Sequence, residues 1–164
     1  MVDWDALLDE YGPMVFRISW RILGHSADVE DNVQEVFLAA YRFQQRQQVR
    51  HWRGLLRRLA MLGALGKLRR RRNDVSLGET SLADPVASPE EIAIGREARA
   101  KLRGAIASLP EREGAVFSLR YFEDLSLQEI AESLRINYSA AATALSRARS
   151  KLERVFGRTA AEKR

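Results

Sequence analysis

The sequence of 164 residues contains no cysteine, four prolines and only two histidines. The absence of cysteine excludes disulfide bonds and thiolate metal sites. His25 and His51 are far apart in the sequence, and neither has a second ligand at metal spacing, so we expect no metal site and no cofactor. Glycine-rich phosphate loops and nucleophile elbows are also missing, so nothing indicates an enzyme or a small-molecule substrate. No apolar segment has a length near the roughly 20 residues that are needed to cross a bilayer, and a signal-peptide pattern is absent. The sequence therefore predicts a cytoplasmic protein without membrane insertion.

Acidic residues are missing from a long central segment. Residues 36–73 contain eleven bases and no acid, whereas residues 1–35 contain eight acids and two bases. Residues 74–97 are acidic and residues 139–164 are basic, within a net charge of +5. Solvated helix faces would mix the two signs more evenly. This segregation indicates that different parts of the chain face different partners, and the basic parts suit a polyanion.

Apolar residues recur at helical spacing through both halves of the chain, and strand patterns are absent. In the first half we expect a helix over residues 5–24 that bends or restarts at Gly12-Pro13. A second helix is expected to be capped by Ser26, and a third covers residues 49–72. Residues 73–87 have linker composition, and Ser88-Pro89 then restarts a helix. The sequence therefore predicts an all-α fold in which two small helical domains, residues 1–73 and 89–164, are joined by an acidic linker over residues 74–88.

Residues 126–152 follow the pattern of two short helices joined by a tight turn. Ser126 and Glu129 form a capping box at the start of the first. Residues 135–138 interrupt the apolar spacing, and we expect Ser139 to cap the second helix. The inner face of that helix is predicted to consist of Ala141, Leu145, Ala148 and Leu152. This pattern is typical of a helix-turn-helix, which places its second helix in the major groove of DNA, and an ordinary helical hairpin is the alternative.

Several short sequence motifs, in their order along the chain, resemble those of a family of RNA polymerase subunits, the sigma factors. The resemblance is to the compact extracytoplasmic-function (ECF) group of this family. Residues 31–37, Asp-Asn-Val-Gln-Glu-Val-Phe, are similar to the family's acid-x-x-Gln-Glu-x-Phe helix, which docks on the polymerase clamp. Residues 52–72 align with its helix that melts the promoter and reads the −10 element. Residues 109–112, 119–122 and 126–152 resemble the domain that reads the −35 element. The resemblance implies core RNA polymerase and promoter DNA as partners, and an anti-sigma factor as regulator.

An acidic helix face is the predicted polymerase contact. Asp31 and Glu35 are four residues apart and share one face, with Gln34 beside them. Because this face is acidic, it should meet a cationic protein surface rather than DNA. Stabilisation of the helix dipole is the alternative for Asp31, but it does not explain Glu35.

The basic segment supplies charges that neutralise phosphates and planar side chains on which unpaired bases stack. For Trp52, as for Phe43, a place in the core is the alternative. The resemblance assigns binding of −10 DNA to Trp52, Arg53, Arg57, Arg58, Lys67, Arg69 and Arg70.

The −35 contacts are predicted at the start of the second helix of the helix-turn-helix. Ser139 and Thr143 should read bases, while Arg147 and Arg149 should contact phosphates. A solvated basic face is the alternative for these two arginines. The full set predicted for −35 DNA is Arg112, Arg120, Ser139, Ala140, Thr143, Ser146, Arg147 and Arg149.

Two helices depart from the family pattern. The family's −10 helix commonly has Ala-Arg-Asn and then, after three further residues, Asp, whereas this chain has residues 60–62, Ala-Met-Leu, and Gly66. The usual Lys and Arg of the −35 helix align with Ala142 and Ala144. Arg135 stands at the turn position where glycine is common, which costs about 1 kcal/mol if the turn is left-handed. These departures keep two alternatives to an initiating sigma factor open: a DNA-binding regulator with a sigma fold, and a decoy that binds an anti-sigma factor.

Overall fold

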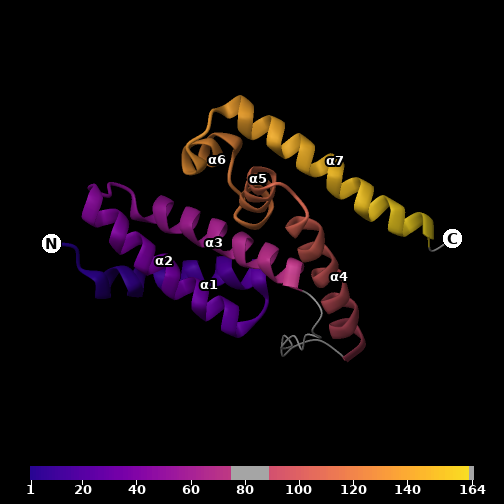
Figure 1. The fold of residues 1–164 in the computed structure, drawn as a ribbon, viewed down its shortest axis with the longest axis horizontal. Helices are drawn as coiled ribbons and strands as arrows, with labels where there is room; N and C mark the ends of the chain where they lie inside the picture. The colour runs from indigo at the N-terminus through magenta and orange to yellow at the C-terminus, as the bar shows by residue number, and fades with distance from the viewer. Residues whose placement is uncertain (75–88, 163–164) are drawn as a thin grey trace.

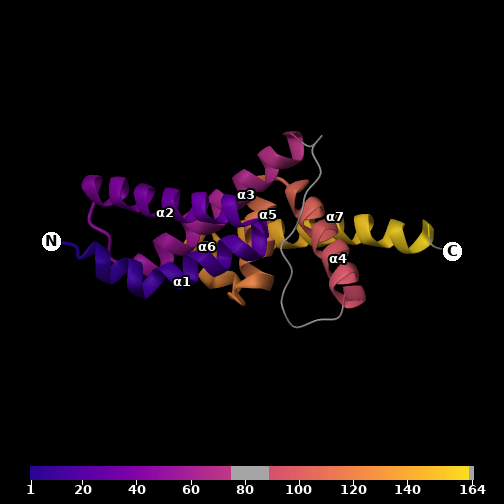
Figure 2. The ribbon, with the colours of Figure 1, turned by 90° about the horizontal axis from the view of Figure 1, so that it is seen from below.

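The computed structural model describes residues 1–74 and 89–162, and within these ranges it contains seven α-helices and no strand. The all-α prediction is therefore confirmed for the described residues. Apart from Asp74, the predicted linker lies outside them. The helices are α1 (Trp4–Leu23), α2 (Ser26–Arg46), α3 (Trp52–Asp74), α4 (Pro89–Ala107), α5 (Glu111–Phe122), α6 (Leu127–Leu134) and α7 (Tyr138–Glu162), as Figures 1 and 2 show.

Most helix boundaries follow local capping chemistry. The predicted capping box is confirmed: the Glu129 N–H donates to the Ser126 hydroxyl at 3.2 Å, and the Ser126 N–H donates to the Glu129 carboxylate at 2.8 Å. Gly24 ends α1 in the left-handed region with φ 61°. Arg135 ends α6 in the same region with φ 56°, which confirms that the turn carries the cost of a left-handed residue other than glycine.

Four expectations about helix ends and continuity were wrong. Ser26 is the first residue of α2 and not its cap. Asn137 caps α7 in place of Ser139, because its Oδ1 accepts the N–H of Ala140 at 2.7 Å and so satisfies a free donor of the first turn. The third helix begins at Trp52 and not at residue 49. The helix does not restart at Pro13, which lies on the exposed side of a continuous α1.

Helices α1, α2 and α3 pack around one buried polar residue. Asn32 of α2 is fully buried, and its amide donates to the Ser19 hydroxyl at 2.8 Å and to the Ala60 carbonyl at 3.2 Å. The nitrogen of one side chain therefore links all three helices, and leaving this buried donor unpaired would cost about 1–3 kcal/mol.

In the second half, α7 packs along α5 and α6. Its predicted inner face is confirmed, because the side chains at positions 141, 145, 148 and 152 are all buried. The two halves also share one apolar cluster, since α3 packs against α5, α6 and α4. Figure 1 shows α5 between α3 on one side and α7 on the other. Among the helices of the described ranges, none combines the length and apolarity that a bilayer span requires.

Candidate nucleic-acid interface

The predicted polymerase contact forms an exposed acidic face on α2. The side chains of Asp31 and Glu35 are 59% and 55% exposed, and Gln34 is exposed between them. Both carboxylates accept hydrogen bonds from the Lys67 ammonium of α3, at 3.0 Å for Glu35. The hydrogen bond from Lys67 holds the pKa of Asp31 below its usual range. The face is thus fixed in position while its outer oxygens remain open to a partner.

Lys67 itself is only 10% exposed in its side chain. It was predicted to bind −10 DNA, but in this structure it is held beneath the acidic face. Its role in DNA binding therefore stays a prediction that requires Lys67 to leave both carboxylates.

Trp52 stands at the edge of an aromatic cluster. Its ring meets Trp4 edge-on at 5.5 Å between centroids, and Trp4 in turn packs on Tyr41 at 5.4 Å. Trp52 is partly buried, whereas Tyr41 is 46% exposed. Phe43 is also partly buried, with the Arg135 guanidinium 5.6 Å from its ring centroid. The structure therefore gives both Trp52 and Phe43 packing partners while leaving part of each ring accessible.

The arginines of α3 divide into two groups. Arg53 and Arg70 are exposed. Arg57, Arg58 and Arg69 are partly buried. Burial lowers the pKa of both Arg57 and Arg58. A cleft of about 460 Å³ separates this part of α3 from α6, and its walls include Arg57, Arg58, Glu129, Glu132 and Arg135. The basic surface of α3 is therefore partly covered by the second half of the chain.

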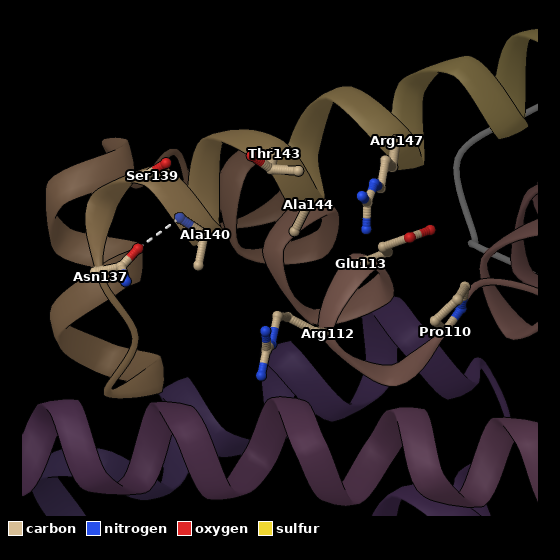
Figure 3. A pocket seen from close by; sticks show the side chains of 9 residues that line it. All are labelled: Pro110, Arg112, Glu113, Asn137, Ser139, Ala140, Thr143, Ala144 and Arg147. Carbon is tan, nitrogen blue, oxygen red and sulfur yellow. Dashed lines mark hydrogen bonds between the residues drawn. The ribbon is translucent and has the colours of Figure 1, made fainter.

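The start of α7 borders an open groove of about 510 Å³. Ser139, Thr143 and Arg147 are exposed along this helix, and Arg112 stands across the groove at the start of α5 (Figure 3). The side chains of Ala140 and Ala144 point into the groove (Figure 3). Because each of these two is a single methyl group, the hollow between α5 and α7 stays open. Ser146 is exposed on α7 but does not line the groove.

Two of the predicted phosphate contacts have partners within the protein. The Arg149 Nε donates to the Tyr121 hydroxyl at 2.6 Å, and its guanidinium lies 5.6 Å from the centre of that ring. Arg120 donates to the Leu125 carbonyl at 2.9 Å. Within the described residues, Arg112 and Arg147 form no such bond, so the structure brings these two together at the groove and leaves them free for an anion.

A contact between the two halves was missed from the sequence. Glu123, in the turn after α5, pairs with Arg17 at 3.3 Å and with Arg21 at 3.2 Å, both on α1. One signal was present: these arginines are the two bases of residues 1–35, and they are four residues apart on one helix face.

Comparisons with known proteins identify the family. The family profile of Sigma-70 region 2 matches residues 7–74, and that of Sigma-70 region 4 matches residues 99–152. The ECF RNA polymerase sigma factor SigE of Mycolicibacterium smegmatis is 27% identical over 168 residues, which cover 99% of this chain and 65% of SigE. The ECF RNA polymerase sigma factor SigW of Bacillus subtilis is 28% identical over 170 residues, which cover 93% of this chain and 89% of SigW.

Two crystal structures share the fold. The Mycobacterium tuberculosis ECF sigma factor SigJ has a TM-score of 0.55 at 22% identity, over 92% of this chain and 52% of SigJ. The sigma factor RpoE of Bartonella quintana, crystallised with the anti-sigma factor NepR, has a TM-score of 0.58 at 15% identity, over 94% of this chain and 97% of RpoE. This chain therefore spans less than two thirds of SigE and of SigJ, but most of SigW and RpoE. The chain belongs to the sigma-70 family, as a homologue of the ECF sigma factors.

Proposed function

We propose that this protein is an ECF-type sigma factor that directs core RNA polymerase to specific promoters and initiates transcription. The observation that carries the proposal is the presence of both family regions, in order, in one chain that has an exposed acidic face on α2 and an open basic groove at α7. The protein would not be an enzyme by itself, and it would act in the cytoplasm, where core polymerase and promoter DNA meet.

Residues 1–73 would bind the polymerase clamp and recognise and melt the −10 element. Asp31, Gln34 and Glu35 support the clamp contact, because they are exposed together on one face and carry the charge that a cationic surface attracts. Arg53 and Arg70 are the fully exposed members of the −10 set, whereas Arg57 and Arg58 face a cleft that also contains Glu129 and Glu132.

Residues 89–164 would bind the −35 element, and residues 74–88 would link the two domains. Ser139 and Thr143 are exposed at the start of α7, where side chains of a recognition helix reach base edges. Arg112 and Arg147 face the groove from α5 and α7, which favours them as phosphate contacts over Arg120 and Arg149.

A regulator that keeps the sigma fold without initiating is the second candidate function. Leu62 and Gly66 favour it, because they offer no hydrogen-bonding side chain at positions where the family commonly has Asn and Asp. We also propose an anti-sigma factor as a partner, supported by the crystal structure of the similar RpoE with NepR.

Transcription with purified core polymerase on a library of upstream DNA regions tests the proposal. We expect transcripts that appear only when the protein is added, from promoters that share two short elements at fixed spacing. The variant Asp31→Lys/Glu35→Lys, which should not bind the clamp, is the control. DNA binding without any transcript would indicate the regulator, and a protein that binds neither DNA nor polymerase would indicate the decoy.

A further inference from the structure

The turn after α5 is bound to α1 by two ion pairs that share one carboxylate. The Glu123 side chain is only 6% exposed, and its two oxygens contact Arg17 at 3.3 Å and Arg21 at 3.2 Å. Arg21 also donates to the carbonyl of Phe122, the last residue of α5. Two cations therefore meet one carboxylate and the negative end of a helix dipole at the same place.

The opposite end of α5 is held from α3. The Arg69 guanidinium donates to the Leu109 carbonyl at 3.1 Å, just before α5 begins. A third contact places Arg135 over the Phe43 ring at the far end of α2. Arginines of the first half thus hold α5 at both of its ends, and α5 lies across α3 (Figure 1).

The acids that the second half contributes lie close to the basic surface of α3. Burial and repulsion by Arg53 lower the pKa of Arg57, and attraction by the carboxylates of Glu123 and Glu129 offsets this only in part. Glu129 and Glu132 line the cleft opposite Arg57 and Arg58. The carboxylates of Glu129 and Glu132 therefore lie on the side from which a DNA phosphate would approach these two arginines.

The turn also contains a strained residue. Asp124 has φ 51°, a left-handed conformation that side chains other than glycine rarely adopt. Its neighbours Phe122 and Glu123 are both bound to Arg21 of α1.

We propose that the contact of Phe122 and Glu123 with Arg17 and Arg21 is an intramolecular lock that keeps DNA away from Arg57 and Arg58, the partly buried arginines of α3, until the two halves separate. This inference rests on the proposed role of α3 in binding −10 DNA. When only a fraction of molecules is open, the apparent affinity for DNA falls by that fraction. Removal of the lock should therefore raise the affinity of the free chain for single-stranded DNA about threefold to tenfold.

The distance between the halves is the first measurement. Because the chain has no cysteine, spin labels at Asp9→Cys on α1 and Ser150→Cys on α7 report this distance without background. Both positions are exposed and lie outside the interface. We expect one narrow distance distribution for the parent protein, and a broader, longer one for each variant that breaks the lock.

Two variants with opposite effects on net charge separate opening from simple electrostatics. Glu123→Gln removes a negative charge, whereas Arg17→Gln/Arg21→Gln removes two positive charges. Each should open the halves and raise the affinity of the full-length protein for a fluorescein-labelled single-stranded DNA of mixed sequence. Glu153→Gln, an exposed site on α7, matches the charge change of Glu123→Gln and should leave both distance and affinity unchanged.

An unchanged distance in both variants overturns the lock. An affinity that rises for Glu123→Gln but falls for the double arginine variant also overturns it. The affinity for single-stranded DNA would then depend on the net charge of the protein and not on separation of the two halves. If both variants open and bind the single-stranded DNA more tightly while the parent protein supports no transcription with core polymerase, the lock stands and the proposed function fails.

Discussion

Gly63 of α3 faces the side chain of Asn32 so closely that a Cβ at residue 63 would lie 2.5 Å from the Asn32 Oδ1. Asn32 cannot move aside easily, because its amide is bonded to Ser19 and to the Ala60 carbonyl. Glycine in a helix interior costs about 1 kcal/mol relative to alanine, so its presence here needs a reason. Close approach of α2 and α3 supplies that reason.

Gly63→Ala should therefore destabilise the protein by about 1–2 kcal/mol, since the clash with Asn32 outweighs the gain in helix propensity. Urea unfolding followed by circular dichroism measures the change. Gly54→Ala is the matched control in the same helix, because a Cβ there would meet nothing within 4 Å, and it should stabilise the protein by up to about 1 kcal/mol. Equal effects of the two substitutions would contradict the packing argument.

The acidic face of α2 predicts a charge-reversal effect. Asp31→Lys/Glu35→Lys should abolish co-purification with core polymerase, because a face that attracts cations would then repel them. Helicity should be retained, since both side chains are exposed, but the free energy of unfolding should fall because Lys67 loses both of its acceptors. Glu30→Lys, an exposed acid of the same helix outside the motif, should retain binding. Undiminished binding by the double variant would show that the clamp contact lies elsewhere.

The capping box makes stability depend on pH in the acid range. The hydrogen bond from the Ser126 N–H holds the pKa of Glu129 below its usual range. Because the folded pKa is lower than the unfolded one, Glu129 contributes stability above pH of about 4.3, and this contribution is lost as the pH falls through the folded pKa. Unfolding free energies measured between pH 3 and pH 6 should vary less in Glu129→Gln than in the parent protein. A pH dependence that is unchanged in the variant would refute this assignment.

The groove at α7 predicts two different effects on promoter binding. Arg147→Ala should weaken holoenzyme binding to all promoters by a similar factor and reduce the slope of log affinity against log salt by about 1, because a phosphate contact is lost. Thr143→Val should instead change which −35 sequences are preferred. Selection of binding sites from a randomised −35 element, at two salt concentrations, separates the outcomes. The reverse pattern would mean that α7 docks in another orientation.

Arg149→Ala is the matched comparison for Arg147→Ala. Because Arg149 is bonded to Tyr121, its removal should lower the melting temperature more than that of Arg147 and should affect the salt slope less. A larger loss of DNA affinity at Arg149 would show that it leaves Tyr121 to contact phosphate.

Local signals in the sequence predicted the helices, the capping box and the inner face of α7, because each depends on residues within a few positions of one another. The sequence did not show which surfaces of the two halves meet. Helical spacing identifies an apolar face but not its partner, and the residues of the Arg21–Glu123 pair are about a hundred positions apart. The position of Lys67 between two acids was missed for the same reason. One sign in the sequence of α3 was overlooked: its apolar residues occur as adjacent pairs. Two neighbouring residues point in different directions from a helix, so such pairs make the apolar face wider than packing against α1 and α2 alone requires. The pairs, all buried, are Leu55 and Leu56, Ala60 and Met61, and Ala64 and Leu65.

The shared apolar cluster has a consequence for how the chain unfolds. Because the cluster continues from α1–α3 into α5–α7, heating should melt both halves in one cooperative transition, with calorimetric and van't Hoff enthalpies in agreement. A cavity made in α1 would then loosen the groove at α7, because both belong to the same cooperative unit. Once the halves part, each must rely on a core of its own, so the cooperativity of the closed chain would be lost when α3 becomes accessible.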